Sequence, residues 1–384
     1  MLTRRIAWLL PVVVLVWIER VWVARVPRSD LDVFLQAGHA VTLGRNPYTA
    51  ATNPFLWHGS AFVYPYLTAL LFAPLSWLPQ DVADIAWFLL CAVAVIAGCW
   101  VLRLRDAIGI AAVLASAPSI RSFQVGALNA LLFLALALLW RYRGRVSALA
   151  SCYAFAAGAK LFLAPMALWL VISRPRGHAF MALASLGGFL AVGFVLEPIS
   201  VHAFFTATST LARHEGPTSL SVLHWAERTL PTSWAMVACV GLAAAVMLFG
   251  LLLYVNIPVG GDGLLFSSCL VASLVATPIY WSHYTLLALI VVLIARPTRT
   301  TAVCFFVATW CIAQPALAWR ALKVPSNWQG AGLYLLLAVT LAVATRSVVA
   351  NQKARPTSVA EPHLEHSQAR GHNERPAANW SSPA

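Results

Sequence analysis

The sequence predicts an all-α protein with many membrane-spanning helices. Of its 384 residues, 60% are hydrophobic and only 10% are charged. The mean hydropathy is +0.77, whereas a soluble globular domain has an apolar content of only about half. Long uncharged apolar runs recur along the chain, and a helix of about 20 residues covers the roughly 30 Å hydrocarbon core of a bilayer. These observations exclude an ordinary soluble fold.

The apolar runs divide the chain into about twelve candidate transmembrane helices. The first run follows Arg4 and Arg5 and lacks a small-residue cleavage site, so we expect a retained helix rather than a signal peptide. The predicted spans are 6–24, 61–78, 82–102, 107–118, 126–141, 147–172, 178–197, 233–255, 263–281, 283–296, 300–319 and 329–348.

Two of these spans are irregular. Span 107–118 corresponds to roughly 18 Å of helix and is too short to cross a bilayer alone. Span 147–172 is long and is interrupted by Lys160 and Pro165. Short or broken helices are tolerated in a membrane where they line a cavity or pack inside the protein. We therefore expect a pocket in the middle of the chain.

The basic residues lie at the ends of apolar spans, which argues against nucleic-acid binding despite a net charge of +13. The positive-inside rule then predicts a plasma-membrane protein with both termini in the cytoplasm. The basic segments expected in the cytoplasm are Arg4/Arg5, Arg174/Arg176, Arg296/Arg299 and the tail from Arg346. The outer face is expected to hold loop 25–60, loop 198–232 and the junction 280–283. Twelve crossings leave two basic segments outside, against the rule: Arg103/Arg105 and 141–145.

The chain is expected to form one transmembrane domain over residues 1–350, followed by a tail over 351–384. The tail is rich in Pro, Ser, His and charge and has no apolar periodicity, so it is predicted to be disordered and cytoplasmic. The seven cysteines all lie in apolar spans without a CxxC motif. We interpret them as small buried hydrophobic residues, and we expect no disulfide framework and no metal site.

Asp30 and Asp32 follow the first span and are the most informative carboxylates in a chain that has few. A carboxylate beside apolar walls can have a raised pKa and act as a general base toward a hydroxyl. The two residues are two positions apart, so on a helix they point to different faces and do not form one dyad. Capping of a short interfacial helix by Ser29 or Asp30 is an equally good interpretation.

Lys160 and His283 are the next candidates. A lysine inside an apolar run is costly unless it is paired or reaches water, which favours a functional role over snorkelling. Its ammonium could hold a phosphate. His283 lies in an outer junction between spans, where an imidazole could contact a phosphate oxygen or relay a proton. The neighbouring Trp281 and Tyr284 are equally typical of an interfacial aromatic belt.

Weaker candidates lie elsewhere. Gln124 and Asn129 are amides at the entrance of an apolar helix, where satisfying broken backbone is slightly favoured over binding hydroxyls. Arg213 and His214 lie on the loop 198–232 and could hold sugars or lipid headgroups. Charge pairing on a solvated loop explains them more simply.

These residues give the chain a resemblance to a known family. It resembles the GT-C membrane glycosyltransferases, and within them glycosyltransferase family 87, which contains actinobacterial polyprenyl-phosphate-mannose-dependent mannosyltransferases. The motifs occur in the family's order over residues 29–284. They are Asp30-Leu-Asp32-Val-Phe-Leu-Gln-Ala-Gly, Gly44-Arg-Asn-Pro-Tyr48, Phe62-Val-Tyr64-Pro65, Gly126-Ala-Leu-Asn129, Lys160 before Pro165, and Trp281-Ser-His283-Tyr284.

The resemblance implies an inverting transfer of one sugar, with mannose expected, from a polyprenyl-phosphate donor to a glycolipid or glycan hydroxyl outside the membrane. It implies Asp30 as the base, with Asp32 as the second choice, and no cofactor or metal. The residues implied near the donor phosphate or pocket are His283, Lys160, Tyr64 and Tyr48. Those implied for sugar or acceptor binding are Gln124, Asn129, Trp281, Arg213 and His214.

Other functions remain open at this stage. A transporter or flippase for a lipid-linked saccharide predicts paired inverted repeats and a charged site at mid-membrane, and Lys160 has no clear repeat partner. A non-catalytic assembly protein of the cell envelope predicts that both aspartates are replaceable. A membrane acyltransferase would need a Ser/His or His/Asp constellation, and none stands out in the sequence.

Overall fold

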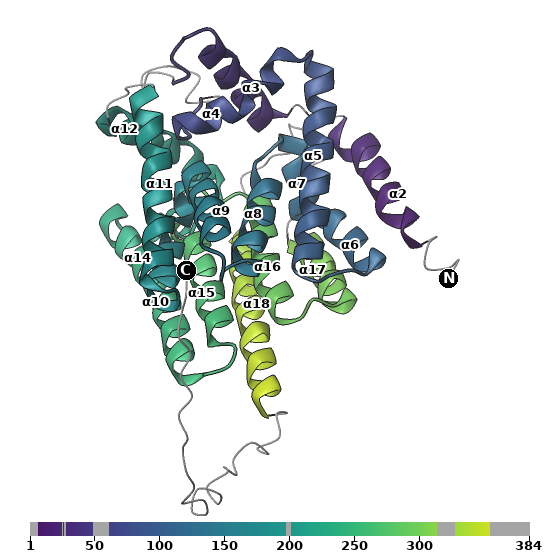
Figure 1. Ribbon diagram of the computed structural model, residues 1–384, viewed down its shortest axis with the longest axis vertical. Helices are drawn as coiled ribbons and strands as arrows, with labels where there is room; N and C mark the ends of the chain where they lie inside the picture. The colour runs from purple at the N-terminus through teal and green to yellow at the C-terminus, as the bar shows by residue number, and fades with distance from the viewer. Residues whose placement is uncertain are drawn as a thin grey trace, which may run out of the picture.

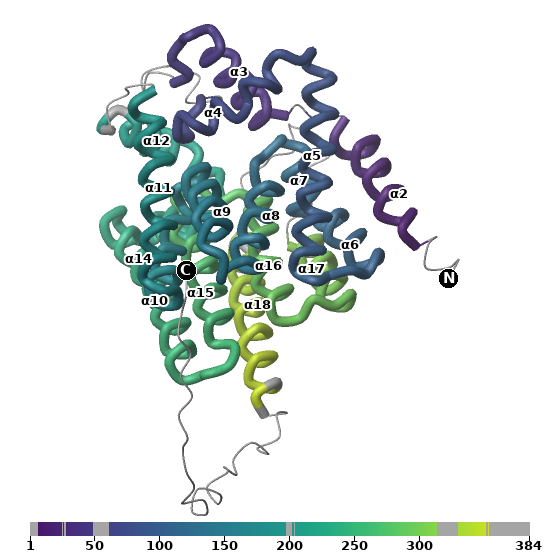
Figure 2. The backbone as a smooth tube through the Cα atoms, in the orientation of Figure 1, coloured from purple at the N-terminus to yellow at the C-terminus, as the bar shows by residue number. Residues whose placement is uncertain are grey.

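The computed structural model describes residues 7–24, 26, 28–48, 61–196, 201–312 and 327–353, and every regular element in these ranges is helical (Figure 1). The tail predicted over 351–384 therefore lies outside the described residues from position 354 onward. Figure 2 follows the backbone from the first helix on one side of the bundle to the last helix near its centre.

A cap of short helices covers one end of the bundle, at the top of Figure 1. In α3 (Ser29–Thr42), the buried positions Leu31, Phe34, Leu35 and Gly38 follow the spacing of one helix face. That face packs on α4 (Tyr66–Phe72), where the Phe34 ring stacks on Phe72 with centroids 4.5 Å apart. The cap also contains a 3-10 turn, η3 (Leu75–Trp77), and the amphipathic helix α12 (Val201–Glu215).

Four helices in the described part of the chain are long and apolar enough to cross a membrane alone. They owe their length to runs of 18 or more apolar residues without an internal proline or a cluster of charges. These helices are α5 (Gln80–Val101), α11 (Arg176–Leu196), α14 (Thr232–Asn256) and α18 (Asn327–Lys353). The protein is thus a multi-pass membrane protein by the length and composition of its helices.

Shorter helices fill the middle of the bundle, often as interrupted pairs. α6 (Ala107–Leu114) and α7 (Ala117–Val125) meet at a 54° bend beside Pro118 and could count as a fifth span. The other members are α8 (Asn129–Arg141), α9 (Val146–Ala159), η4 (Leu161–Met166), α10 (Ala167–Ser173), α15 (Gly261–Ala276), η6 (Ser282–Leu287), α16 (Ala288–Ala295) and α17 (Arg299–Ile312).

The core is formed by these shorter helices together with one face each of α5 and α18, whereas α11 and α14 contribute little to it. In α15 all but two residues are buried, whereas only 17% of the apolar window of α11 and of α14 is buried. The remaining elements are α2 (Leu9–Ile18), the π-helical turn η1 (Glu19–Val23) that follows it, the turn η5 (Gly216–Thr218), and α13 (Val222–Glu227).

One predicted span is wrong in its extent, and a second is confirmed as an interrupted helix. The segment 61–78 is not one helix, because the chain forms only the seven-residue α4 and the turn η3, separated by Pro74. The segment 147–172 is divided at Lys160, whose backbone is extended (φ −139°, ψ 99°) between α9 and η4. The pocket expected in the middle of the chain does adjoin this break, at Leu161.

Two basic segments that twelve crossings would place on opposite sides lie at the same end of the bundle. Arg143 Nε donates to Asp262 Oδ2 at 3.0 Å, Arg174 forms an ion pair with the same carboxylate, and Trp169 Nε1 donates to Asp262 Oδ1 at 2.8 Å. The basic ends of α8 and α10 therefore meet at the start of α15, away from the cap (Figure 1). Arg143 and Arg174 share one end of the bundle because the helix between them is interrupted at Lys160.

The prediction for the cysteines is confirmed in part. Cys91, Cys99, Cys239 and Cys269 are buried. Cys304 and Cys311 are exposed, because α17 buries the opposite face, which carries Ala302, Phe305 and Thr309.

Candidate active site

Asp30 lies where the first turn of α3 passes over the connection between α7 and α8. Leu31 is fully buried against Gly126, which has a φ of +74°. A Cβ atom on Gly126 would come within 2.5 Å of the Leu31 Cβ, so only glycine permits this approach. The carbonyl of Gly126 accepts a hydrogen bond from Trp87 Nε1 at 2.9 Å. The start of α3 is thereby placed beside α7, α8 and α5.

Two cations influence Asp30. Lys160 and Arg121 both lie close enough to lower its pKa electrostatically, and the Ser29 hydroxyl, 3.5 Å from Asp30 Oδ1, acts in the same direction. Loss of hydration is the larger effect, so the pKa of Asp30 is raised above its ordinary value of 3.8. A carboxylate of raised pKa that still faces cations is suited to accept a proton from a hydroxyl.

Lys160 occupies the extended break between α9 and η4 and is buried. Its Nζ donates to the Tyr284 hydroxyl at 2.8 Å. The ammonium also lies 4.5 Å from the centroid of the Tyr284 ring and 5.1 Å from that of Tyr64. Phe162 stacks on Tyr284 with centroids 5.2 Å apart, which holds the tyrosine in place. The aromatic faces stabilise a charge that apolar surroundings alone would disfavour.

Arg121 is a site residue that the sequence motifs do not single out. It lies on α7, is half-buried, and contributes to the electrostatics of Asp30 and of His283. Its Nη1 is 3.4 Å from Gln124 Oε1 on the same helix. Arg121 lies between two predicted spans and beside Ser119, Ser122 and Gln124, so hydropathy gives no signal that singles it out.

His283 and Asn129 present buried polar atoms at the same end of the bundle. His283 lies on η6 and is 4% exposed, and its Nε2 has no hydrogen-bond partner among the described residues. Asn129 begins α8 and is fully buried, and neither polar atom of its amide is satisfied within the described part of the chain. Both α7 and α8 pack against η6. Buried polar atoms without partners are costly, so these two are suited to bind polar groups of a ligand.

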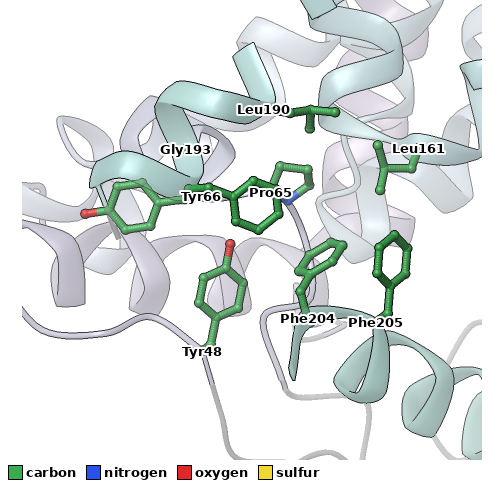
Figure 3. A pocket seen from close by; sticks show the side chains of 9 residues that line it. Tyr48, Pro65, Tyr66, Leu161, Leu190, Gly193, Phe204 and Phe205 are labelled. Carbon is green, nitrogen blue, oxygen red and sulfur yellow. The ribbon is translucent and has the colours of Figure 1, made fainter. Parts of the chain in front are cut away.

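The polar residues described above are called here the cluster; they are Asp30, Tyr64, Arg121, Asn129, Lys160 and His283. An apolar pocket of about 210 Å³, whose lining is shown in Figure 3, adjoins this cluster along the chain. Two of its lining residues adjoin the cluster in sequence, since Pro65 follows Tyr64 and Leu161 follows Lys160. The Tyr48 hydroxyl donates to the Tyr64 carbonyl at 2.9 Å and so ties the wall of the pocket to the cluster. The lining residues are Tyr48, Pro65, Tyr66, Leu161, Leu190, Gly193, Phe194, Phe204 and Phe205.

Tyr64 joins the pocket to the cations. The Lys160 ammonium lies over the Tyr64 ring and acts on its hydroxyl electrostatically. Burial raises the pKa of Tyr64, and Asp30 raises it further, while Lys160 lowers it. Tyr64 therefore stays protonated and can act as a hydrogen-bond donor.

Two predicted residues have other partners. Gln124 Nε2 donates to the carbonyl of Trp22 at 3.1 Å, which agrees with the interpretation that this amide satisfies irregular backbone. Asp32 Oδ1 accepts from Gln80 Nε2 at 3.0 Å, on the side of α5. Burial and the neighbouring Asp84 raise the pKa of Asp32. As expected from their spacing, Asp30 and Asp32 have different surroundings.

The remaining predicted residues lie around the cluster or apart from it. Trp281 directly precedes η6, is half-buried, and accepts a backbone hydrogen bond from Tyr284 at 2.9 Å. Arg213 is exposed at the end of α12, with Nη2 3.4 Å from the Thr210 hydroxyl of the same helix. His214 follows it and is half-buried. The described residues contain no group of three or more His, Cys, Asp or Glu side chains arranged to hold a metal ion.

Comparison with known proteins gives one match. Glycosyltransferase family 87 matches residues 62–278, more than half of the chain, and this range includes Tyr64, Arg121 and Lys160. No curated protein and no solved structure matches the chain. The cluster at the capped end of a helical membrane bundle and the extent of the family match lead to one conclusion: the chain belongs to glycosyltransferase family 87 and is a membrane glycosyltransferase.

Proposed function

We propose that the protein transfers one sugar, with mannose expected, from a polyprenyl-phosphate donor to a hydroxyl of a glycolipid or glycan. The observation that carries this proposal is the placement of Asp30 in the field of Lys160 and Arg121, beside an apolar pocket. The carboxylate can accept the proton of the acceptor hydroxyl, and the cations can bind a phosphate. The pocket can bind an isoprenoid chain.

The reaction follows from these roles. Asp30 takes the proton of the acceptor hydroxyl while the acceptor oxygen attacks the anomeric carbon. The bond from that carbon to the phosphate oxygen breaks, and its electron pair leaves with polyprenyl phosphate. Lys160 and Arg121 stabilise the negative charge that develops on the phosphate. Attack opposite to the leaving group inverts the configuration at the anomeric carbon.

The pocket supports a lipid-linked donor. Its lining is aromatic and aliphatic, with the tyrosine hydroxyls as the polar side-chain groups, and residues of α11 form part of it. Most of α11 is not covered by other protein elements. We infer that the isoprenoid tail enters sideways from the bilayer, with its phosphate at Lys160. His283 and Asn129 then offer their unsatisfied polar atoms to the sugar or phosphate.

The site is proposed to face away from the cytoplasm. It lies beneath the cap formed by α3 and α4, whereas the basic ends of α8 and α10 gather around Asp262 away from the cap. Basic residues favour the cytoplasmic side of a membrane. This arrangement supports a donor and an acceptor presented on the outer face of the plasma membrane.

The proposal is tested with purified protein in nanodiscs. Short-chain polyprenyl-phosphate mannose and a lipid extract of the host are supplied, and released polyprenyl phosphate and new glycolipid are followed by mass spectrometry. The Asp30→Asn variant is expected to lose activity by about 10²-fold or more, because a positioned base typically contributes that much. The Asp32→Asn variant is expected to stay active.

The outcomes separate the rival functions. Equal activity of Asp30→Asn and the unchanged protein would contradict the assignment of the base. An absence of transfer with mannose-carrying and with arabinose-carrying donors would overturn the proposed reaction and favour a transporter or an assembly protein. Folding of each variant is checked by size-exclusion chromatography and by its Tm.

A further inference from the structure

A buried arginine precedes the helix that carries Asp30. Arg28 lies directly before α3, and its side chain is 5% exposed. One of its guanidinium nitrogens lies 3.8 Å from Glu19 Oε2 on η1, and another lies 3.8 Å from Asp84 Oδ1 on α5. The guanidinium also donates to the backbone carbonyl of Asp84. Arg28 thus joins the start of α3 to the elements on two sides of it.

A second link connects the same helix to α5 through Gln80. The Nε2 atom of Gln80 is 3.0 Å from Asp32 Oδ1 and 3.0 Å from Asp84 Oδ1, so one amide donates to two carboxylates. Asp84 is therefore shared between Arg28 and Gln80. The four residues Arg28, Asp84, Gln80 and Asp32 form one continuous polar network, called here the α3–α5 clamp.

The geometry of a helix makes this clamp relevant to Asp30. Successive residues of an α-helix point about 100° apart around its axis. Asp30 interacts electrostatically with Lys160 and Arg121, Leu31 contacts Gly126, and Asp32 contacts Gln80. Three consecutive residues of α3 thus each interact with a different part of the protein. A rotation of α3 that released Asp32 from Gln80 would also turn Asp30 away from Lys160 and Arg121.

We propose that the α3–α5 clamp is a positioning device that sets the rotation of α3 about its axis and so aims Asp30 at the cation pair. In this proposal Asp32 and Gln80 are positioning residues and neither touches the substrate. The inference rests on the proposed role of Asp30 as the base. It predicts that disturbing the clamp lowers kcat, since a displacement of about 1 Å at a reacting group can cost 10²-fold in rate.

The decisive variants alter the exposed part of the clamp, where folding tolerates substitution. Gln80→Glu removes the donor and places a third carboxylate beside Asp32 and Asp84. We expect kcat to fall by at least about tenfold, with KM for the donor little changed, because the pocket residues lie elsewhere. Asp32→Asn keeps an acceptor oxygen for Gln80 and is expected to retain kcat within about threefold. Gln36→Glu, the same change at an exposed position of α3, is the matched control.

An exchange variant distinguishes positioning from catalysis. In Asp32→Asn/Gln80→Glu the donor and acceptor trade places, so the hydrogen bond between α3 and α5 can form again. The clamp predicts that kcat recovers relative to Gln80→Glu alone. If Asp32 were the base, kcat would be lost in every variant that lacks it, and that result would overturn the proposal.

A readout independent of activity separates this inference from the proposed function. Hydrogen exchange of the backbone amides at 30–35 is followed by mass spectrometry in nanodiscs for each variant. Faster exchange in Gln80→Glu, reversed in the exchange variant and absent in Gln36→Glu, is expected even if the donor has been misassigned. Unchanged exchange in Gln80→Glu would show that the clamp does not hold α3 and would overturn the inference.

Discussion

Lys160 and Arg121 place two positive charges near one carboxylate in a largely apolar protein. Unpaired charges cost free energy in such surroundings. A site with a net positive charge is therefore stabilised when it binds an anionic ligand. The tyrosines at Lys160 offset part of this cost through a hydrogen bond and ring contacts. Binding of a phosphate would neutralise the remaining charge.

The pKa of Asp30 leads to a prediction about pH. A carboxylic acid is a base only above its pKa, so the acidic limb of the pH–activity profile should lie above 3.8, the ordinary value for aspartate. Lys160 lowers the pKa of Asp30. Replacing Lys160 by Met should therefore move the acidic limb of kcat/KM to a higher pH, in addition to lowering the rate.

The measurement is a profile of kcat/KM against pH for the unchanged protein and for Lys160→Met. Arg121→Met should shift the limb in the same direction, since Arg121 also lowers the pKa of Asp30. Arg213→Met removes an exposed cation and serves as the control. A limb that stays at one pH in all four proteins would show that Asp30 is not the group that titrates.

Single residues were predictable where their chemistry conflicts with their surroundings. Lys160 stands out because a lysine in an apolar run needs an explanation, and Asp30 because carboxylates are scarce. Arg121 could not be singled out in this way, because it sits among serines near Pro118, where the segment resembles an ordinary helix start. The partners of Asp32 and Gln124 could not be predicted, because Gln80 and Trp22 lie far away in the sequence.

At the scale of elements, the contact between α3 and the α7–α8 connection controls the site. Gly126 combines a positive φ with direct contact to Leu31, so it serves both the turn and the packing. A side chain at this position strains the backbone and pushes the first turn of α3 away. The family motif at 126–129 thus has a steric cause in addition to any role of Asn129 in binding.

The variant Gly126→Ala should lower both stability and activity. We expect a loss of about 1–3 kcal/mol in stability, from backbone strain and overpacking, and a fall in kcat through displacement of Asp30. Stability is measured as the Tm in detergent, and activity as sugar transfer in nanodiscs. Gly187→Ala is the control. Gly187 lies on α11, and a Cβ atom added there would have no neighbouring atom within 4 Å. Equal Tm values for both variants would contradict the packing argument.

Hydropathy identified the apolar segments but not how they divide into helices. The segment 61–78 is apolar enough to resemble a span, yet Pro65, Pro74 and Pro79 confine its helical part to seven residues. In 147–172 the interruption by Lys160 and Pro165 was visible in the sequence, and the pocket expected there adjoins it at Leu161. The exact bend between α6 and α7 depends on packing that one sequence does not reveal.

For the whole molecule, the two ends of the bundle differ in chemistry. The capped end holds Asp30 and the aromatic pocket, and the other end holds arginines gathered on Asp262. Arg143 rests on the Trp140 ring at 4.0 Å and Arg174 on the Trp169 ring at 5.0 Å, an arrangement suited to a membrane interface. The seven-residue α4 belongs to the cap at one end of the bundle and is too short to cross a membrane.

This arrangement predicts a sidedness that labelling can test. In a cysteine-free background, Gly44→Cys in the cap should react with a membrane-impermeant maleimide from outside intact cells. Gly144→Cys and Gly177→Cys, which adjoin Arg143 and Arg174, should both react only after the cells are opened. Reaction of 144 and 177 from opposite sides would contradict the shared contact with Asp262. Each variant is first checked for transferase activity.

Family membership and membrane character follow from composition and motif order, whereas only the contacts of Asp262 reveal which basic segments share one end of the bundle. The sequence places Arg143 and Arg174 on either side of the interrupted span 147–172, and counting that span as one crossing would separate them. Only the break at Lys160 returns the chain to the same end. The break at Lys160 therefore determines which of the earlier segments lie at the same end of the bundle as Arg174.

The pocket is lined in part by α11, and in the proposed function its donor enters from the bilayer. The relevant substrate concentration is then that of the donor within the membrane. A donor that arrives through the side of the protein is drawn from the lipid phase and not from the aqueous phase. Its encounter with the site is two-dimensional, so the rate depends on the mole fraction of donor among the surrounding lipids. Adding inert lipid at a constant amount of donor therefore dilutes the substrate. KM values measured in micelles and in cells become comparable only when they are expressed as the mole fraction of donor in the lipid.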